Sequence, residues 1–424
     1  MSELAESTKE QYLEPAITGK VGDADPDTFP DGGLRAWSVA LGNAGVMFCT
    51  LGYVNSWSVY QAYYEGHQLR DVSPSAIAWI GSLQAFFIFG SGLIGGPLFD
   101  RMGAKVIYPA AIIYLFSIFM TSLCKEYYQF MLAQGILGGL ANGFTMSPSM
   151  AATPQYFKKK RGAAMGLAIA GSSIGGVILP IALNQLITQT DLGFGWSVRI
   201  VGFLMLVVLI PSCLAIRARL PPRKTHFFLP GAFKDRSYSL LIACMFFTFL
   251  GLFPPMFYIP SWALTQGMGA TLAFYLAAIL NAASFPGRVI PAVLSDKIGP
   301  LNVLCVAGLT TGILTLCWQR VEGNAGIIVF TAIFGFCSGA IISGAVIPLA
   351  SCTKTAQNIG TYMGMGMAVG SLAVLAGPPA TGAMYERYHD FDAVSTFCGM
   401  MCLVGALLVI PVKIVSGHAL LSKT

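Results

Sequence analysis

The residue with the most informative chemistry is Arg288, in the stretch ILNAASFPGRVIPAVLSDK (279–297). Ser284 and Asn281 precede it by four and seven residues, so all three share one face of a helix. An ionisable side chain on a polar stripe within an apolar segment predicts a functional site. The guanidinium stays charged at physiological pH and would suit an anionic ligand as a fixed counter-charge. Alternatively, Arg288 lies near enough to the segment's end to reach water.

The segments that must position Arg288 are long and apolar. Of the 424 residues, 55% are hydrophobic and 10% are charged, whereas soluble domains carry about 25% charged residues. Apolar runs of about 20 residues, the length that crosses a bilayer, recur along the chain. Since backbone groups in lipid must be hydrogen-bonded within the segment, these runs predict transmembrane helices. The twelve expected spans are 36–62, 76–99, 105–124, 128–152, 162–188, 196–216, 237–265, 271–294, 301–319, 325–350, 357–383 and 394–415.

The distribution of Lys and Arg predicts the orientation of these spans. Nineteen of the 25 cations fall on the side of the N-terminus, four fall on the other side, and Arg199 and Arg288 lie within spans. Because cytoplasmic loops carry the excess of cations, we expect both termini in the cytoplasm. We expect the plasma membrane as the location, with the vacuolar membrane as the alternative. The net charge of +6 therefore reflects membrane topology and is poor evidence for nucleic-acid binding.

We expect an all-α protein made of two six-helix bundles, at residues 36–216 and 237–415. A charged linker, 217–236, joins them. The polar residues 1–35 predict a disordered cytoplasmic tail, and residues 416–424 a short C-terminal tail. The stretch GPLFDRMGAK (96–105) has a weaker copy, PAVLSDKIGP (291–300), at the corresponding place in the second half. Such internal repeats are typical of transporters whose substrate site lies between two bundles.

The spans lack most chemistry that an enzyme would use. Every Asp, Glu and His lies outside them, and the ten Cys form no CxxC unit, so we expect no metal site and no cofactor. No G-x-x-x-x-G-K motif for nucleotide phosphates occurs. An integral-membrane enzyme would need clustered histidines or carboxylates. The protein is therefore not expected to be an enzyme.

Four stretches together resemble one family. GPLFDRMGAK supplies the G-x-L-x-D-R-x-G-x-K motif of the major facilitator superfamily, and DGGLRAW (31–37) resembles the entry motif of its monocarboxylate porters. The stretches YFKKKRGAAMGLAIAGSSIGG (156–176) and GGLANGFTMSPSM (138–150) resemble the fifth and fourth spans of those porters. The resemblance covers about residues 31 to 415 and is nearest to the fungal branch, which includes nutrient carriers and exporters of secondary metabolites.

The resemblance implies roles for particular residues. Arg288 matches the eighth-span arginine that holds a substrate carboxylate, although Ser284 stands where mammalian members carry an aspartate. No lysine occurs in the first span. The resemblance also implies that the loop motif (96–105) and its weaker copy (291–300) form a conformational latch between the two bundles. Its residues are Asp100, Arg101, Lys105, Asp296 and Lys297.

Other residues carry weaker expectations. Gly166 and Ala170, and Gly360 and Gly364, are small residues spaced four apart, which predicts helix faces that approach closely in lipid. These faces serve either sliding or static packing. Polar or aromatic residues within spans are candidates for substrate contact or for interhelical hydrogen bonds. Besides Arg288, Ser284 and Asn281, the candidates are Asn55, Asn142 and Tyr258.

The most specific expectation is a secondary carrier that moves a small organic anion or secondary metabolite by alternating access, exporting it from a fungal cell. Proton-linked uptake of a monocarboxylate or a vitamin such as riboflavin is one alternative, and a transport-dead membrane sensor is another. The expected partners are the small-molecule substrate and the lipid bilayer.

Overall fold

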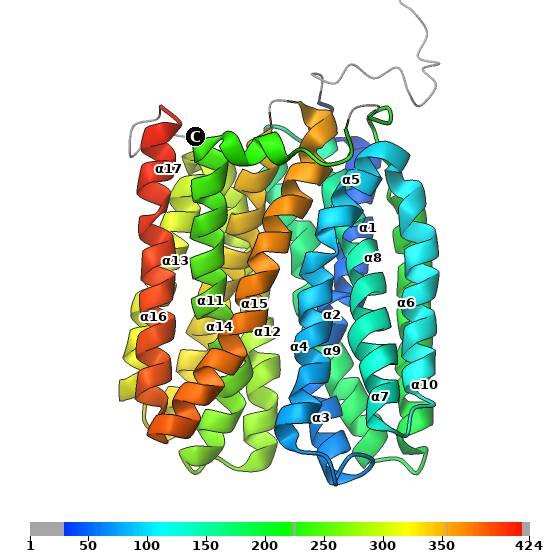
Figure 1. Ribbon diagram of the computed structural model, residues 1–424, viewed down its shortest axis with the longest axis vertical. Helices are drawn as coiled ribbons and strands as arrows, with labels where there is room; N and C mark the ends of the chain where they lie inside the picture. The colour runs from blue at the N-terminus through cyan, green and yellow to red at the C-terminus, as the bar shows by residue number, and fades with distance from the viewer. Residues whose placement is uncertain (1–28, 224–225, 354, 418–424) are drawn as a thin grey trace, which may run out of the picture.

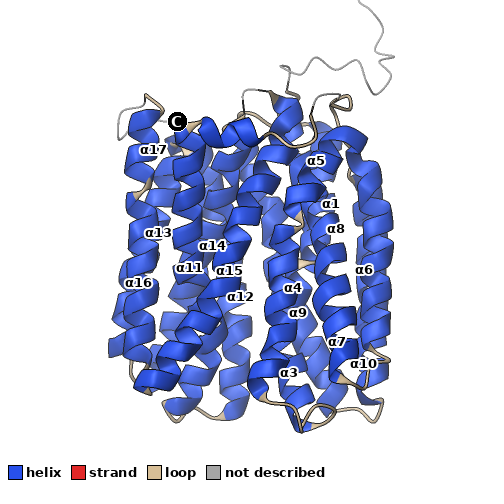
Figure 2. Ribbon diagram, viewed as in Figure 1, coloured by secondary structure: helices blue, strands red, loops and turns tan. Residues whose placement is uncertain are grey.

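The computed structural model describes residues 29–223, 226–353 and 355–417. Within these ranges the chain consists of helices and connecting loops, without a strand (Figure 2). The expected all-helical membrane fold is therefore confirmed. Residues 1–28 and 418–424, most of the two expected tails, lie outside the described residues.

The helices are numbered in chain order. The first ten are α1 (Gly33–Cys49), α2 (Leu51–Val54), α3 (Trp57–Gly66), α4 (Pro74–Gly90), α5 (Gly92–Met102), α6 (Ile107–Thr121), α7 (Tyr127–Phe130), α8 (Gly139–Ala152), α9 (Arg161–Thr188) and α10 (Gly193–Ala215). The others are α11 (Arg236–Thr265), α12 (Ala270–Ile298), α13 (Pro300–Cys317), α14 (Gly323–Ser351), α15 (Ile359–Tyr388), α16 (Phe391–Leu407) and α17 (Val409–Val415). Short 3₁₀ or π segments are η1 (Gly103–Val106), η2 (Met131–Gly138), η3 (Thr153–Gln155), η4 (Pro230–Lys234), η5 (Trp318–Arg320) and η6 (Ala356–Asn358).

The helices form two groups that stand side by side (Figure 1). We call α1–α10 the N-half and α11–α17 the C-half. Within the N-half, α1 packs on α9 and α10, and within the C-half, α12 packs on α14 and α13 on α16. The halves meet chiefly in two places, where α9 packs on α12 and where α15 packs on the consecutive helices α4 and α5. We call the end at which the described chain begins and ends the terminal end (Figure 1).

Among the described residues, ten helical segments are long and apolar enough to cross a membrane by length and composition. One of them, Ala76–Thr121, contains α4, α5 and α6 and reverses direction at the terminal end (Figure 1). The segment from Tyr127 to Ala152, which contains the π-helical η2, is not among the ten. The chain is thus a multi-pass membrane protein.

The two copies of the loop motif end their helices in the same way. Gly103 follows α5 with φ 67°, and Gly299 follows α12 with φ 96°. Only glycine adopts such backbone angles without a steric cost, which explains a glycine three residues after Asp100 and again after Asp296. The chain turns sharply at both places, so each aspartate lies at the terminal end of its helix.

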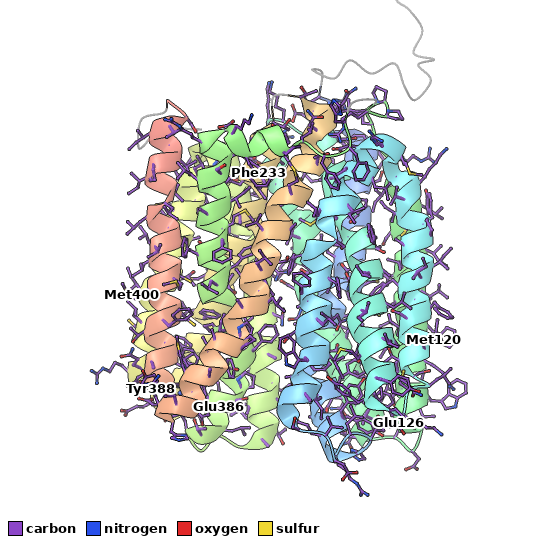
Figure 3. The ribbon with its side chains drawn as sticks, in the orientation of Figure 1. Met120, Glu126, Phe233, Glu386, Tyr388 and Met400 are labelled. Atoms are coloured by element: carbon purple, nitrogen blue, oxygen red, sulfur yellow. The ribbon has the colours of Figure 1, made fainter. Side chains whose placement is uncertain are left out.

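Large apolar side chains cover the outside of both halves. Val207 is 71% exposed, Ile112 68% and Ile414 63%, as expected for helix faces that contact lipid. Charged side chains lie toward the ends of the helices: Figure 3 shows Glu126 and Glu386 at the end opposite the terminal end. The distribution is that of a bundle whose middle zone is surrounded by hydrocarbon.

The expected N-terminal tail is too long by a few residues. Helix α1 begins at Gly33, and the Asp31 carboxylate accepts hydrogen bonds from the backbone N–H groups of Lys158 at 2.6 Å and Lys159 at 2.7 Å. The residues just before α1 are therefore ordered against the loop that precedes α9. The tail was overestimated because polar composition alone does not reveal a tertiary partner.

Candidate functional site

The site lies where α9 of the N-half crosses α12 of the C-half. The helices run antiparallel, and glycines on α9 let the two backbones touch: a Cβ atom added at Gly166 would lie 2.8 Å from the carbonyl oxygen of Arg288. Further along, a Cβ at Gly176 would lie 2.6 Å from the side-chain oxygen of Asn281. The small residues predicted to permit close packing at Gly166 therefore face the opposite half.

Arg288 lies at the centre of this crossing. It precedes the end of α12 at Ile298 by ten residues, which is about 15 Å at helical rise. Its side chain is 3% exposed. Nη1 donates to the carbonyl oxygen of Ile169 at 3.2 Å and to the hydroxyl of Ser172, both on α9. Because the guanidinium binds the opposite half, the alternative that Arg288 reaches water at the membrane surface is wrong.

The charge of Arg288 has only neutral acceptors among the described residues. Its Nε atom is buried without a hydrogen-bond partner. No described carboxylate forms a salt bridge with it; the two recorded salt bridges join Arg70 to Asp71 and Arg223 to Asp100. Burying an arginine without a counter-charge is costly, so the site is suited to an incoming anion.

Asn281, in the polar stripe before Arg288, also faces the N-half. Asn281 donates to the side-chain oxygen of Asn55 at 3.4 Å and to the carbonyl of Ala277 at 2.9 Å. The Asn281 oxygen and the Ser284 hydroxyl are buried without hydrogen-bond partners in the described chain. Of the six predicted contact residues, the structure thus brings Asn55, Asn281 and Arg288 to the contact between the halves. The Ser284 hydroxyl instead lies against Gly339 of α14, where an added Cβ would be 2.8 Å from it, within the C-half.

The other two predicted contact residues lie elsewhere, and no recorded contact links either of them to Arg288. Asn142 is fully buried within the N-half on α8, and neither side-chain atom has a hydrogen-bond partner. Tyr258 lies in the C-terminal part of α11. Its hydroxyl donates to the carbonyl of Pro378 at 3.2 Å, within the C-half. A polar residue in an apolar span does not by itself reveal which neighbour it faces.

The predicted latch residues Asp100 and Asp296 bind the first turn of a helix in the opposite half. Asp100 accepts from the backbone N–H groups of Gly360 at 3.1 Å and Thr361 at 2.7 Å, at the start of α15. The Thr361 hydroxyl also donates to Asp100 at 2.6 Å. A carboxylate at a helix N-terminus satisfies free N–H groups and favours the positive end of the helix dipole.

Asp296 repeats this arrangement in the second copy of the motif. Its carboxylate accepts from the backbone N–H groups of Gly162 at 2.7 Å and Ala163 at 2.9 Å, at the start of α9. Each aspartate thus binds the second and third residues of the opposing helix. The cations of the latch point outward: Arg101, Lys105 and Lys297 are exposed, and Arg101 lies 5.2 Å from the ring of Phe227.

Arg223 of the linker also belongs to this latch, although it was not among the predicted residues. Its side chain is 4% exposed, and its Nη1 atom lies 3.7 Å from the Asp100 carboxylate and 3.1 Å from the Asn358 side-chain oxygen, which accepts from it. Burial lowers the pKa of Arg223, while Asp100 acts in the opposite direction. Its only sequence signal was that it belongs to a charged loop.

The remaining glycines fall into two classes. A Cβ at Gly360 would lie 2.7 Å from the carbonyl oxygen of Gly96, and Gly364 lies against Gly92, so both face α5 of the opposite half. Gly171, in contrast, faces Ala44 of α1 within its own half. Ala170, the predicted partner of Gly166, is fully buried. The small-residue spacing predicts close contact but does not identify the partner helix.

An apolar wall adjoins the polar stripe. One hydrophobic cluster joins N-half side chains to the core of the C-half, and its N-half members include Met47, Phe89, Met146, Met165 and Ile169. The ring of Phe89 lies 6.0 Å from that of Phe253 on α11. Methionine side chains are flexible and adapt to differently shaped ligands. The interface therefore pairs one buried cation with a deformable apolar surface.

Comparisons with known proteins identify the family to which the chain is similar. A family model described as "Major Facilitator Superfamily" matches residues 43–351 and 289–419. The aspyridones efflux protein of Emericella nidulans is 52% identical over 416 residues, which cover 98% of this chain and 84% of that protein. The agnestins efflux protein of Paecilomyces divaricatus is 38% identical over 92% of this chain and 90% of its own length.

A solved structure shares the fold. The human organic anion transporter MFSD10 (TETRAN) superimposes with a TM-score of 0.70 at 16% sequence identity, covering 89% of this chain and all of that one. At this identity the likeness concerns the fold alone.

Proposed function

Because the chain belongs to the Major Facilitator Superfamily of transporters, we propose that it is a secondary active carrier that exports a small anionic secondary metabolite from a fungal cell. Two relatives that match nearly all of the chain are named as efflux proteins, for aspyridones and for agnestins. The carrier would need no cofactor, since gradients rather than a bound group drive such transport. Within the superfamily, the motifs at 31–37 and 156–176 favour the monocarboxylate porter branch.

The proposed topology has twelve passages through the plasma membrane, with the terminal end in the cytoplasm. Treating Ala76–Thr121 as two passages and Tyr127–Ala152 as a further one brings the ten apolar segments to twelve. The excess of Lys and Arg at the terminal end supports this orientation. Residues 36–216 and 237–415 would form the two moving units, and 217–236 the linker between them.

The observation that carries the proposal is the burial of Arg288 between the halves. It is the only charged residue in the middle of the predicted spans, apart from Arg199, which binds the Ser122 hydroxyl at 3.0 Å near the start of α10. A substrate carboxylate or similar anion would bind the guanidinium in two-pronged geometry. Asn281, Ser284 and Asn55 would bind other polar atoms of the substrate, and the methionine-rich wall its apolar body.

Alternating access would require the two contacts between the halves, α9 with α12 and α15 with α4 and α5, to open and close. The Asp100 and Asp296 contacts close the terminal end, so release of both caps would open the site toward the proposed cytoplasm. The substrate would enter from there and leave after the opposite end opens. No Asp, Glu or His lies in the middle of the spans, so any coupled proton would travel on the substrate or on water.

The test is transport by purified protein in proteoliposomes, with an aromatic carboxylate, 2-naphthoate, and its neutral amide. We expect wild type to prefer the anion, and Arg288→Ala to lose about 30-fold or more in affinity for it, as for a charge pair worth about 2–5 kcal/mol. Arg288→Lys should recover only part of this loss, because lysine lacks the planar two-pronged contact. Arg199→Ala, the matched control within another span, should keep the preference.

The outcomes also separate the alternatives. Transport of the anion by Arg288→Ala at the wild-type level would exclude Arg288 from the site. Net movement only toward the cytoplasmic side would favour uptake of a monocarboxylate or of a vitamin such as riboflavin. Absence of flux, with ligand binding retained, would favour a membrane sensor.

A further inference from the structure

The guanidinium of Arg288 is already bound to the opposite half. Its Nη1 atom donates to Ile169 and Ser172, and the Ser172 hydroxyl itself donates to the Ile169 carbonyl at 2.7 Å. Three groups thus form a closed set of hydrogen bonds between α12 and α9. We call this set the Arg288–Ser172 clasp.

The clasp is a weak arrangement for a buried cation. Both acceptors are neutral, and Nε of Arg288 has no partner in the described chain. A carboxylate would add an opposite charge and could accept two parallel N–H···O bonds from the guanidinium, which the carbonyl and the hydroxyl cannot do. An anion that reached Arg288 would therefore displace a backbone carbonyl and a hydroxyl from it.

The crossing keeps Arg288 from solvent, since its side chain is 3% exposed. Six residues before Ser172, toward the terminal end, a Cβ at Gly166 would lie 2.8 Å from the Arg288 carbonyl oxygen. Four residues after Ser172, a Cβ at Gly176 would lie 2.6 Å from the Asn281 oxygen. A ligand can reach the guanidinium only after the helices that bury it separate, and separation of α9 from α12 removes Ser172 and Ile169 from Arg288.

Polar groups that could hold the rest of such a ligand lie beside the clasp. The Ser173 hydroxyl, next to Ser172 on α9, is fully buried without a partner, as is the Ser284 hydroxyl one turn before Arg288. The oxygen of Asn281 is in the same state. Buried polar groups are normally hydrogen-bonded, so these groups could bind polar atoms of a ligand that enters between the helices.

We propose that the substrate's anionic group replaces Ser172 and Ile169 as the acceptor of Arg288, so that binding itself releases α9 from α12. This inference rests on the proposed function of Arg288 as the anion site. It makes Ser172 a positioning residue that sets affinity from the opposite half. Because the clasp must break before the anion binds, the free energy of the clasp opposes binding, and weakening the clasp strengthens binding.

The experiment compares Ser172→Ala with Ser338→Ala in the full chain. Ser338 is a matched control on α14: it is fully buried, and its hydroxyl donates at 2.8 Å to the carbonyl three residues earlier, as Ser172 does. The first measurement is hydrogen exchange of the peptides from α9 and α12 in ligand-free protein. The second is the dissociation constant of 2-naphthoate, with 2-naphthamide as the neutral comparison.

Ser172→Ala should exchange faster than wild type across the α9–α12 crossing. It should bind 2-naphthoate about threefold to tenfold more tightly, the effect of removing one neutral hydrogen bond from the competing state. Binding of 2-naphthamide should not tighten. Ser338→Ala should match wild type in both measurements. A direct contact between Ser172 and substrate predicts the opposite sign, namely weaker binding.

The two measurements distinguish an error in the clasp proposal from an error in the assignment of Arg288 as the anion site. Unchanged exchange and unchanged or weaker 2-naphthoate binding in Ser172→Ala, with wild type still preferring the anion, would overturn the clasp and leave Arg288 as the anion site. Equal affinity of wild type for 2-naphthoate and 2-naphthamide, or no binding of either, would overturn the anion site and with it the inference.

Discussion

The backbone N–H of Arg223 donates to the backbone carbonyl of Asp100 at 2.7 Å, and its guanidinium lies 3.7 Å from the Asp100 carboxylate. The same guanidinium donates to Asn358 at 3.1 Å and to the Phe227 carbonyl at 2.8 Å. One linker residue therefore contacts the end of α5, the residue that precedes α15 and the rest of the linker. The linker is therefore packed against the closed terminal end and is more than a flexible connection between the halves.

The reactivity of the native residue Cys352 can be used to measure opening of the terminal end. Burial, with a smaller contribution from Asp235, raises the pKa of Cys352 to about 12. Only the thiolate reacts quickly with maleimides, so Cys352 should react slowly near pH 7.5. Just before it, the Ala350 carbonyl and the Ser351 hydroxyl accept from Arg161 of the N-half at 3.2 and 3.0 Å. Separation of the halves should expose Cys352, lower its pKa and speed its labelling.

Replacing Arg223 by glutamine should loosen the terminal end. The substitution removes the cation beside Asp100, and losing one partner of a buried pair typically costs about 3–5 kcal/mol, less here because Asp100 keeps its backbone donors. We expect labelling of Cys352 to accelerate at least severalfold. Exposed Cys317, at the other end, serves as an internal standard. Arg217→Gln, an exposed linker substitution, should behave as wild type; equal rates in the two variants would remove Arg223 from the latch.

Removal of either aspartate cap should loosen the terminal end. Asp100→Ala removes two backbone bonds, the Thr361 hydroxyl bond and the partner of Arg223. Asp296→Ala removes the backbone bonds to Gly162 and Ala163 and a favourable charge interaction with Arg161. Loss of a helix cap costs about 0.5–2 kcal/mol. Labelling of Cys352 should therefore rise in both variants. Wild-type labelling in one of them would exclude that aspartate from the latch.

Gly166→Leu should stop transport without preventing membrane insertion. A leucine would have to enter the space of the Ala292 side chain and the Arg288 carbonyl, where even a Cβ has no room, so α9 and α12 could not close. Gly66→Leu is the control, because a Cβ at Gly66, the last residue of α3, meets nothing within 4 Å. Flux of 2-naphthoate in proteoliposomes measures the effect. Wild-type flux in Gly166→Leu would mean that the crossing opens freely.

Substrate binding should follow the ionisation of the ligand rather than of the protein. Arg288 stays charged at physiological pH, and the spans contain no His and no mid-membrane carboxylate. Since an aromatic carboxylic acid has a pKa of roughly 4, like that of Glu, the affinity for 2-naphthoate should be constant between about pH 6 and pH 8. It should fall as the pH drops through the pKa of the ligand, because the neutral acid no longer pairs with Arg288. A midpoint near pH 7 would reveal a titrating group in the protein.

Much of the architecture follows from the sequence because lipid restricts what the backbone can do. Apolar runs of membrane length must be helical, and charged residues must gather at their ends. The repeated loop motif likewise predicted that Asp100 and Asp296 lie at the ends of helices. Arg288 was identifiable because a cation in an apolar run is costly and so is rarely without function.

Only the tertiary structure showed which helices pack against one another and therefore which neighbour each residue faces. Gly166 and Gly171 lie on the same helix with similar neighbours in the sequence, yet one faces α12 of the opposite half and the other α1 of its own. Asn142 and Asn55 are both asparagines in apolar spans, but only Asn55 reaches the stripe of Arg288. Helical spacing determines which residues share a face, whereas the crossing of helices far apart in the chain determines what that face meets. For that reason Ser172 and Arg223, whose roles depend on contacts more than 100 residues away, became visible only in the folded protein.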